Sequence, residues 1–237
     1  MSGVRLCMGN GCATMAPYIE KKEGIPMDVH EKMHNGDLYG PSEALVQEQA
    51  ACLERQFEFN HTHPTDFARR EALLREMFAE IGPGCYIETP LHANWAGKFV
   101  HLGRSVYVNF NLTLVDDTAI YIGDYTMIGP NVTIATGTHP ILPALREKLY
   151  QFNMPVRIGR NCWLGAGAII LPGVTIGDNV VVGAGSVVTH DLPDNVVAVG
   201  NPCRVLRPVG ERDREIYFRG RPSPPEILAE VGEAPAE

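Results

Sequence analysis

The sequence predicts a mainly β protein whose central part is a parallel β-helix built from hexapeptide repeats. The first observation is that an aliphatic residue returns at every sixth position of one segment: Ile158, Leu164, Ile170, Ile176, Val182 and Val188. The second is that glycine and other turn-forming residues interrupt this segment too often for one long strand. The third is that six steps around an α-helix, at about 100° each, leave these residues on no common face.

Very short strands, each with an inward residue before a turn, satisfy all three observations. Three such strands make one triangular coil, and the coils stack at about 4.8 Å, the spacing of paired strands. The residues two positions before each aliphatic residue are small or β-branched, as a narrow interior requires: Val156, Cys162, Ala168, Val174, Val180 and Ser186. We therefore expect both sets of side chains to point inward.

Two further runs extend the period upstream, the second displaced by two residues: Ile122, Ile128 and Ile134, and then Leu102, Val108 and Leu114. Together the runs predict a β-helix over residues 85–207. Between Ile134 and Val156 the period fails, because its positions fall on Pro140, Arg146 and Phe152. Residues 135–155 are therefore predicted to leave the coils as an exposed loop, and long loops inside regular folds are often functional.

Residues 28–84 are predicted to form an N-terminal helical segment. Its clearest helix lies in the sequence PTDFARREALLREMFAEIG, with Thr65 or Asp66 as the N-cap and Gly82 at the end. Its apolar face is expected to contain Phe67, Leu74, Met77 and Phe78. Such a segment can cover one open end of the β-helix and hide the unpaired strand edges there.

Both termini are predicted to lie outside the coils. Residues 1–27 have no clear period and are expected to form a poorly ordered extension. Residues 208–237 form a C-terminal tail, and roughly its last fifteen residues are rich in proline and glutamate and expected to be disordered.

The composition of the 237-residue chain narrows the classes of function. It is 45% hydrophobic and 20% charged with a net charge of −8, which indicates a globular protein without a nucleic-acid surface. No signal peptide and no run of about eighteen apolar residues is recognisable, so we expect a cytoplasmic protein with no membrane partner. The six cysteines form no Cys-x-x-Cys pair, so reduced thiols are expected. Cys7 and Cys12 are too few ligands for a closed metal site, and the histidines include no close pair on the coils, so no metal is expected.

His139 is a candidate functional residue because it lies where the chain leaves the coils, directly before Pro140. Imidazole, with an unperturbed pKa of about 6.5, suits a general base at neutral pH. An exposed loop histidine is more often solvated and idle, so position alone does not assign this role.

Four segments resemble the hexapeptide-repeat O-acetyltransferases, in particular the group of galactoside and maltose O-acetyltransferases. They are FNHTHP (59–64), NFNLTLVDD (109–117), GPNVTIATGTHP (129–140) and the run from CWLGAGAIILPG to NPCRVLR (162–207). The similarity covers about residues 31–218, with almost no gaps in the coils. It implies a left-handed β-helix and a homotrimer with an active site between each two neighbouring copies. It also implies acetyl transfer from acetyl-CoA to a hydroxyl group of a small-molecule acceptor, with no metal.

The resemblance implies roles for individual residues as well. His139 matches the family's catalytic histidine, which acts as the general base, and the backbone N–H of Ala166 is expected to stabilise the oxyanion. The residues expected along CoA are Ala184, Thr189, His190, Arg204 and Arg207, with Trp163 nearby. A guanidinium group pairs with phosphate as a fork, which suits the two arginines to the phosphates of CoA. His190 departs from the family, in which lysine is usual.

At the positions expected to contact the acceptor, the sequence matches the family less closely. Asn109 and Asp117 match the family's polar contacts to sugar hydroxyls, although both also suit turns of a β-helix. Trp95 replaces the serine or aspartate of the named relatives, and its indole is expected to offer a stacking face to a flat apolar acceptor. Two other readings remain open: an antibiotic or amino-acid acceptor with the same fold and donor, and an inactive β-helical scaffold. The presence of His139 together with Asn109 and Asp117 argues against the scaffold.

Overall fold

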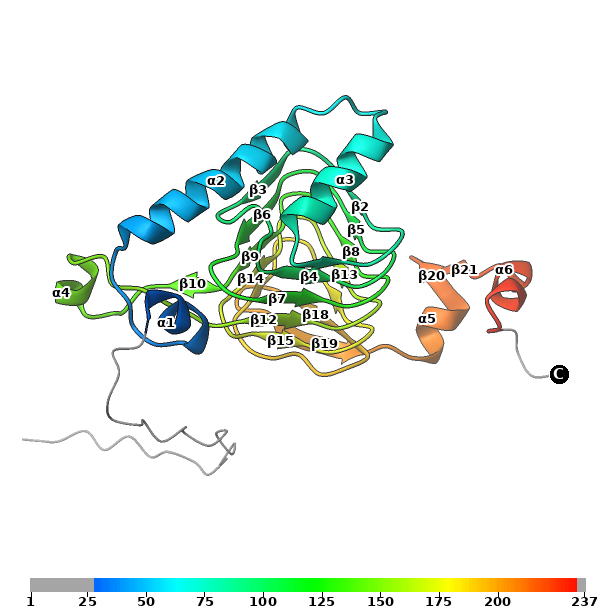
Figure 1. Cartoon of the computed structure of the whole chain (residues 1–237). Helices are drawn as coiled ribbons and strands as arrows, with labels where there is room; N and C mark the ends of the chain where they lie inside the picture. Colours follow the sequence, from blue (N-terminus) through cyan, green and yellow to red (C-terminus); the bar gives the residue numbers. More distant parts are fainter. Residues whose placement is uncertain (1–27, 234–237) are drawn as a thin grey trace, which may run out of the picture.

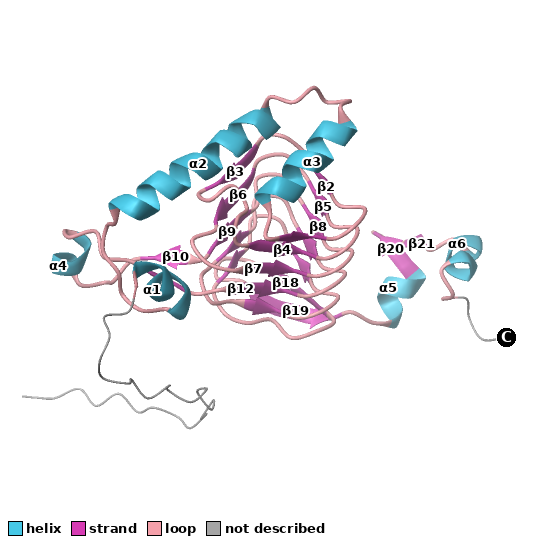
Figure 2. Ribbon diagram, viewed as in Figure 1, coloured by secondary structure: helices cyan, strands magenta, loops and turns pink. Residues whose placement is uncertain are grey.

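The computed structural model describes residues 28–233. The extension expected over residues 1–27, with Cys7 and Cys12, and residues 234–237 lie outside the described part. The described chain winds into stacked triangular coils, and two helices lie over one end of the stack (Figure 1). Figure 2 shows the short strands of successive coils stacked on one another and joined by turns.

The coils have three flat faces, and the chain visits them in the order I, II and III. Face I contains β1 (Glu80–Ile81), β4 (Val100–Leu102), β7 (Ile120–Ile122), β12 (Val156–Ile158) and β15 (Thr175–Ile176). Face II contains β2 (Tyr86–Ile87), β5 (Tyr107–Val108), β8 (Met127–Ile128), β13 (Trp163–Leu164), β16 (Val181–Val182) and β18 (Val196–Val199), with β19 (Arg204–Pro208) at its edge. Face III contains β3 (Leu91–Ala93), β6 (Leu112–Val115), β9 (Thr133–Ala135), β14 (Ile169–Ile170) and β17 (Val187–Val188). All neighbours within a face are parallel except β18 and β19, so the predicted parallel β-helix is confirmed.

The residues with the six-residue period fill the interior. Every aliphatic position of the three runs is buried, with exposed fractions between 0 and 3%. The inward set from Val156 to Ser186 is buried to the same extent, including the Cys162 thiol, whose pKa is raised by burial. Burying a large aliphatic side chain contributes about 1.5–3 kcal/mol relative to leaving it exposed. The repeated inward residue is therefore the main source of stability of the coils.

The two-residue displacement between the upstream runs corresponds to a longer turn between β6 and β7. Asp116 lies in this turn and is fully buried. Its carboxylate accepts hydrogen bonds from the backbone N–H groups of Trp95 and Gly97, both at 2.8 Å. Burial raises the pKa of Asp116 to about 6. The extra residues thus join two neighbouring coils through a buried carboxyl group.

Helix α2 (Glu43–Asn60) lies across the end of the stack, where β3 is the outermost strand of face III (Figure 1). Its side chains bond the free backbone groups of that strand. Asn60 bonds both the C=O and the N–H of Leu91 at 2.8 Å, and Gln56 accepts from the N–H of Ala93 at 2.7 Å. The strand edge, which would otherwise invite pairing with another chain, is satisfied within the molecule.

Helix α3 (Phe67–Met77) lies beside α2 over the same end (Figure 1). Arg70 is buried and donates to the C=O of Ile87 in β2 at 2.7 Å. Its guanidinium lies 5.5 Å from the ring centres of Phe59 and Tyr86, within the range of cation–π attraction. Helix α3 thereby covers the outer edge of face II as α2 covers that of face III.

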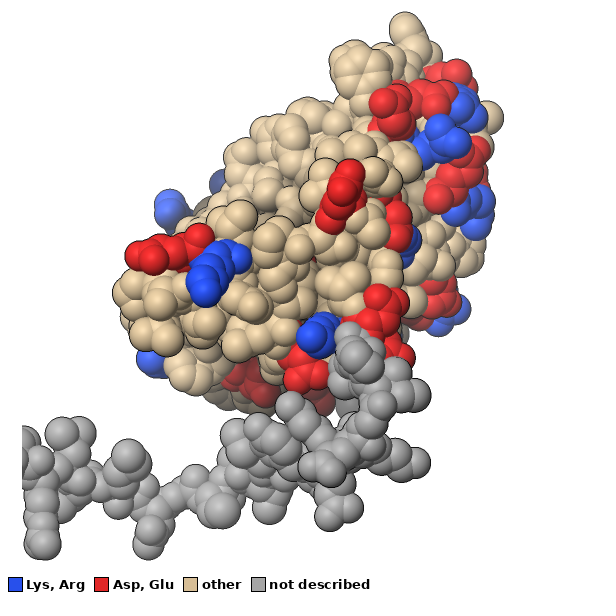
Figure 3. All heavy atoms as spheres, turned by 60° about the vertical axis from the view of Figure 1, so that its left-hand side comes forward, with Lys and Arg blue, Asp and Glu red and all other residues tan. Residues whose placement is uncertain are grey.

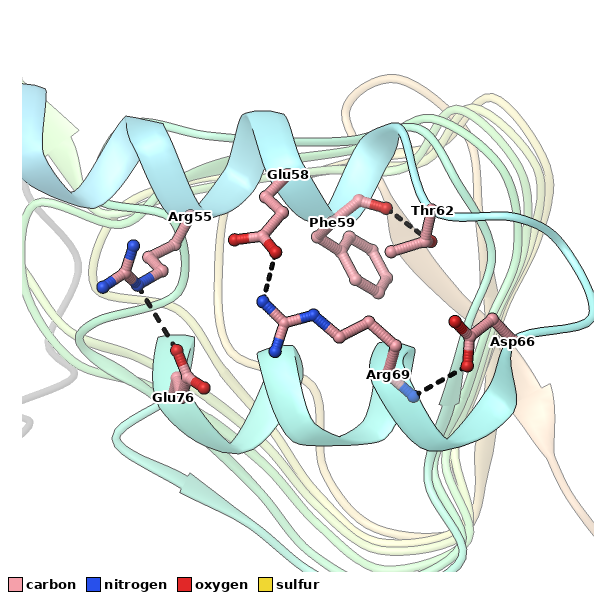
Figure 4. Close-up of polar contacts among 7 residues, drawn as sticks. All are labelled: Arg55, Glu58, Phe59, Thr62, Asp66, Arg69 and Glu76. Atoms are coloured by element: carbon pink, nitrogen blue, oxygen red, sulfur yellow. Dashed lines mark hydrogen bonds and ion pairs between the residues drawn. The ribbon is translucent and has the colours of Figure 1, made fainter.

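Figure 4 shows the polar contacts that join the two helices. Arg55 pairs with Glu76 at 3.3 Å, and Arg69 pairs with Glu58. Asp66 caps α3, because its carboxylate accepts from the backbone N–H of Arg69 at 3.1 Å. The ion pairs are largely exposed and contribute little to stability, so the helices are held mainly by their buried apolar side.

Two expectations for α3 are wrong. Phe67, expected on the apolar face, is 60% exposed, because the inward face carries Leu73 and its neighbours instead. The helix was expected to run to Gly82, but it ends at Met77 because residues 80–81 pair with β4 as strand β1. The coils therefore begin at Glu80, five residues earlier than the repeat indicates.

The remaining elements lie at the margins of the coils. Helix α1 (Val29–Asn35) precedes α2. The predicted loop contains β10 (Gly137–Thr138), α4 (Pro143–Arg146) and β11 (Phe152–Asn153), and it projects from the coils on the side opposite the C-terminal segment (Figure 1). That segment contains α5 (Glu211–Glu215), β20 (Ile216–Phe218), β21 (Arg221–Pro222) and α6 (Pro225–Glu230). Helix α6 lies where we expected disorder.

The inward and outward positions of one strand should differ sharply in their effect on stability. Ile176 is 1% exposed, so Ile176→Ala should lower the free energy of unfolding by about 2–5 kcal/mol by leaving a cavity between coils. Thr175→Ala changes the neighbouring exposed side chain and should alter it by less than about 0.5 kcal/mol. Urea unfolding followed by circular dichroism checks both values. Equal losses would contradict the assignment of inward positions.

Candidate active site

Most of the candidate residues fall at two corners of the coils, on opposite edges of face III. We call the turns from face II to face III the II–III corner, and the turns from face III to face I the III–I corner. The II–III corner holds Asn109, Ala166 and Ala184, which follow β5, β13 and β16. The III–I corner holds Trp95, Asp117, His139, Thr189 and His190, which follow β3, β6, β9 and β17. One chain therefore does not bring all these residues together.

At the III–I corner, Asp117 is held by two neighbouring side chains. Its Oδ1 accepts from Asn94 Nδ2 and from Trp95 Nε1, both at 3.1 Å. The residue is 8% exposed, and Oδ2 has no hydrogen-bond donor among residues 28–233. A side chain at Gly137 would collide with Oδ2, so only glycine lets the loop pass this carboxylate. Asp117 thus has one fixed oxygen and one oxygen free to accept a further hydrogen bond.

The stacking face expected for Trp95 is not available. The indole is 4% exposed and packs against the ring of Phe99, with 5.5 Å between ring centres. The ammonium group of Lys98 lies 5.3 Å from the indole centre. Because the ring is buried, Trp95 acts on the corner through its N–H, which fixes Asp117. This corrects the expectation that the indole itself meets a flat acceptor.

His139 lies on the loop, exposed, directly after β10. Its Nδ1 lies 2.9 Å from the backbone oxygen of Tyr150 on the returning side of the loop. A carbonyl oxygen can only accept, so Nδ1 carries the hydrogen and the neutral ring keeps its lone pair on Nε2. His139 is therefore in the tautomer that a general base requires, and no residue of the described chain is bonded to its basic nitrogen.

The loop is fastened to the segment between α1 and α2. The backbone N–H of Tyr39 donates to the oxygen of Gln151, and the N–H of Gln151 donates to that of Tyr39, both at 3.0 Å. Asn153, fully buried, donates from Nδ2 to the C=O of Met33 and to the Tyr39 hydroxyl at 2.9 Å, and to the C=O of Asp117 at 3.2 Å. These contacts hold β11 and the residues just before it, including Tyr150, and through Tyr150 they hold the His139 ring.

Sequence reasoning missed Asn94, Tyr39 and Asn153. None of them stands at a position of the six-residue period, and each acts on a residue that is distant in the sequence or belongs to another turn. The one available signal was the failure of the period over residues 135–155, which marked the loop but not its fastening.

At the II–III corner, Ala166 occupies a tight turn. The N–H of Ala168 donates to the C=O of Gly165 at 3.1 Å, and Gly167 has a φ of 68°, as the third residue of a type II turn requires. Ala166 is exposed, and no residue of the described chain accepts a hydrogen bond from its backbone N–H. The corner thus presents a free amide donor to an approaching molecule.

Ala184 lies directly beside Ala166 on the next coil. The N–H of Gly185 donates to the C=O of Ala166 at 2.9 Å. A Cβ at Gly165 would lie 2.5 Å from the Ala184 nitrogen, so the close approach of the two turns requires glycine there. The repeated Gly-Ala-Gly sequence therefore builds a smooth exposed column of small residues.

The other expected CoA-contacting residues lie on face II, on its edge strand β19 and at the III–I corner. Trp163 is 53% exposed on β13. Thr189 and His190 contact each other, with 2.8 Å between Oγ1 and Nδ1. Arg204 Nη1 donates to the C=O of Cys203 at 2.8 Å. Arg207 forms two hydrogen bonds with Asp213, a partner that the sequence did not indicate.

Asn109 serves its own turn, because its Oδ1 accepts from the backbone N–H of Phe110 at 2.8 Å. Its amide nitrogen has no partner in the described chain, so a donor remains. The turn role and the contact role considered for Asn109 are therefore compatible.

The described residues offer neither a metal site nor a membrane-spanning helix. Residues 28–233 contain no group of three or more His, Cys, Asp or Glu side chains that could hold a metal ion. None of the helices in the same range has the length and apolarity needed to cross a bilayer.

Comparisons with known proteins agree with the predicted resemblance. Residues 155–190 match the model of the hexapeptide repeat of succinyl-transferase, and residues 32–82 match the maltose acetyltransferase hexapeptide capping motif. The second match spans most of α1 and all of α2 and α3, the helical segment described above.

Individual relatives match over most of their length. The galactoside O-acetyltransferase of Lactococcus lactis is 49% identical over 196 residues, which cover 82% of this chain and 95% of the relative. The structure of a galactoside acetyltransferase in complex with coenzyme A has a TM-score of 0.81 and 42% identity, covering 84% of this chain and all of the other. A hexapeptide-repeat acetyltransferase of Vibrio cholerae complexed with acetyl-CoA has a TM-score of 0.72 and 32% identity, covering 78% and 100%. The chain belongs to the family of hexapeptide-repeat acetyltransferases that includes the galactoside O-acetyltransferases.

Proposed function

We propose that this protein transfers an acetyl group from acetyl-CoA to a hydroxyl group of a sugar or glycoside. The observation that carries the proposal is His139, which has Nδ1 bound to a carbonyl and Nε2 free at the corner that also holds Asp117. The Lactococcus lactis relative and one of the two solved structures are galactoside acetyltransferases, and the solved structures contain coenzyme A or acetyl-CoA. We also propose a cytoplasmic location, because acetyl-CoA is made and used inside cells.

The reaction needs a base and an oxyanion donor. His139 Nε2 would take the proton of the acceptor hydroxyl while its oxygen attacks the thioester carbon. The oxygen of the tetrahedral intermediate would accept from the free N–H of Ala166, at a place where the donor needs no rearrangement. When the C–S bond breaks, the imidazolium would return the proton to the thiolate, so CoA leaves as the thiol. The products are the acetyl ester and CoA, and His139 is again neutral.

Asp117 and Asn109 would orient the acceptor. The free Oδ2 of Asp117 can accept a hydrogen bond from a second sugar hydroxyl, and the free Nδ2 of Asn109 can donate one. A buried carboxylate that loses its partner is costly, so a sugar with hydroxyls in the right places is preferred over an apolar molecule. Trp95 contributes indirectly, because it holds the other oxygen of Asp117.

For the donor, we propose that CoA lies along the exposed column of Ala166 and Ala184. Trp163 would flank it, Arg204 and Arg207 would contact its nucleotide end, and Thr189 and His190, which lie at the III–I corner, would reach it from a neighbouring copy. The small side chains of the column leave room for an extended chain, and the arginines offer positive charge to phosphates.

We further propose a homotrimer with three shared sites. The general base and the amide donor lie at opposite edges of face III in one chain, so a site containing both needs two copies. In a closed cyclic assembly, the II–III corner of each copy meets the III–I corner of the next. Every interface then contains one complete site. Exposed apolar side chains support burial against a neighbour: Met127 and Trp163 on face II, and Ile141, Leu142 and Leu149 on the loop. Figure 3, in which the side bearing the loop comes forward, shows few charged side chains over most of that side.

The experiment that tests the reaction measures release of free thiol from acetyl-CoA over a panel of hydroxyl acceptors. Transfer to galactosides or maltose supports the proposal. Transfer only to antibiotics or amino acids would show that the acceptor is not a sugar. No transfer to any acceptor would favour the inactive scaffold.

His139→Ala should lower kcat by at least about 10²-fold, because it removes the general base. The melting temperature should stay nearly unchanged, since the ring is exposed on the loop. The measurement is steady-state thiol release, with His63→Ala, another exposed histidine, as the control. A His139 variant that kept more than a tenth of wild-type turnover would remove His139 as the base.

Ala166→Pro should remove the oxyanion donor without disturbing the turn. The second residue of a type II turn accepts proline, and proline lacks only the N–H. We expect kcat to fall about 10²–10³-fold, the effect of losing one such donor, while binding of CoA persists. Turnover and calorimetric binding of CoA measure the two effects. Unchanged turnover would show that the N–H of Ala166 is not the oxyanion donor.

The same two inactive variants can test where the site forms. In mixed assemblies, a site regains both groups when His139 comes from the Ala166→Pro copy and Ala166 from the His139→Ala copy. Random mixing in equal amounts should restore about a quarter of the sites of a closed ring. Activity that does not return after the copies are dissociated and reassembled together would place the whole site within one chain.

Trp95→Phe should weaken use of the acceptor without affecting the donor. The change keeps a buried ring but removes the N–H that holds Asp117, and a hydrogen bond to a charged group is worth about 1.5–3 kcal/mol. We expect kcat/KM for the sugar to fall about tenfold or more, with KM for acetyl-CoA unchanged. Phe99→Leu, which alters the packing of the indole but no bond to Asp117, serves as the control. Equal loss in both variants would mean that packing alone matters.

A further inference from the structure

Arg207, in β19, is held by Asp213, in α5. Arg207 Nη1 donates to Asp213 Oδ2 at 2.7 Å, and Nη2 donates to Oδ1 at 2.6 Å. The two side chains are 34% and 31% exposed, so the pair is only partly open to water. Such a two-point contact fixes the plane of the guanidinium as well as its position.

The contact with Asp213 uses only part of the N–H donors of Arg207. Arginine has five N–H bonds, of which two point to Asp213 and a third, on Nη1, to the C=O of Pro208 at 3.0 Å. The remaining two are on Nε and Nη2. They share one edge of the guanidinium, because Nη2 is the nitrogen on the same side as the Nε hydrogen. No residue of the described chain accepts from this edge, so it is a complete second fork.

Asp213 is itself anchored. Its Oδ2 also accepts from the backbone N–H of Gly210 at 3.0 Å, at the start of α5. The hydrogen bond from Arg207, followed by that from Gly210, lowers the pKa of Asp213 below its usual range, so the carboxylate is charged at neutral pH. Within residues 28–233 Arg204 has no such anchor, since the one hydrogen bond of its side chain goes to the C=O of the preceding residue. Arg207 is thus the arginine whose geometry is set in advance.

We propose that Asp213 is a positioning residue for the donor, which holds Arg207 so that its free fork faces a phosphate of CoA, the 3′-phosphate, before CoA binds. This inference rests on the proposed placement of CoA at Arg207. A long side chain ordered beforehand loses less conformational freedom on binding, which favours affinity. The opposite role is physically distinct: if Asp213 competed with the phosphate for Arg207, its removal would strengthen binding.

The test compares CoA with dephospho-CoA, which lacks the 3′-phosphate, by titration calorimetry on the full chain. Asp213→Asn keeps the size of the side chain but replaces one accepting oxygen with a donor. Glu215→Gln is the matched control, because it removes the same charge from the same helix and its side chain has no contact with Arg207. Arg207→Ala defines the preference that remains without this arginine.

We expect wild type and Glu215→Gln to bind CoA more tightly than dephospho-CoA. In Asp213→Asn, the Kd of CoA should rise about fivefold or more and that of dephospho-CoA should change less than about twofold, which moves the preference toward that of Arg207→Ala. If Asp213 only stabilised the local fold, Asp213→Asn would weaken the binding of CoA and of dephospho-CoA alike, and this result would overturn the inference.

Tighter binding of CoA by Asp213→Asn would establish competition and also overturn it. A preference that survives in Arg207→Ala would show that another group reads the phosphate, which removes the role of Asp213 as well. Absence of any CoA binding by the wild type is a different failure, since it contradicts the proposed function itself.

Discussion

The narrow interior of the β-helix admits only closely packed, mostly apolar side chains, at each position of the six-residue period and two positions before it, and the rest of the structure depends on this constraint. The interior is filled by mostly aliphatic side chains that stack from coil to coil, and the exposed fractions at the positions of the period do not exceed 3%. A strand of two to four residues cannot carry a functional side chain inward without replacing part of this core. Polar chemistry is therefore confined to the corners, where the chain turns, and to the places where it leaves the period. The two corners flanking face III carry most of the candidate residues for this reason.

The departures from the period coincide with the candidate site. The two extra residues between β6 and β7 create the turn of Asp116 and Asp117, and the failure after Ile134 creates the loop of His139. The sequence was sufficient to predict the faces, the inward residues and the loop, because each depends on a period that is visible within one segment. It also made His139 a candidate, because its place at the exit from the coils combines with the resemblance to a family.

Contacts between distant segments could not be predicted in this way. Tyr39 and Gln151 are 112 positions apart, and no period connects them. Arg207 and Asp213 are close in sequence, but the bend between β19 and α5 that joins them has no repeat to reveal it. Trp95 was misjudged for a related reason. Its residue type suggests a stacking surface, whereas its burial depends on Phe99, Lys98 and the segment around Met33, which only the folded chain brings together.

The backbone pairing of Tyr39 with Gln151, here called the seam, allows the coils and the loop that carries His139 to differ in thermal stability. The coils share one continuous core, whereas the His139 ring depends on hydrogen bonds between the loop and the segment before α2, which packs in a separate, smaller cluster with Met33, Tyr39 and Trp95. Local opening requires less free energy than global unfolding wherever buried contacts are few. A high melting temperature of the coils therefore does not imply that activity persists to the same temperature. An engineer who wished to extend the working range would gain more by reinforcing this seam than by improving a core that is already closed.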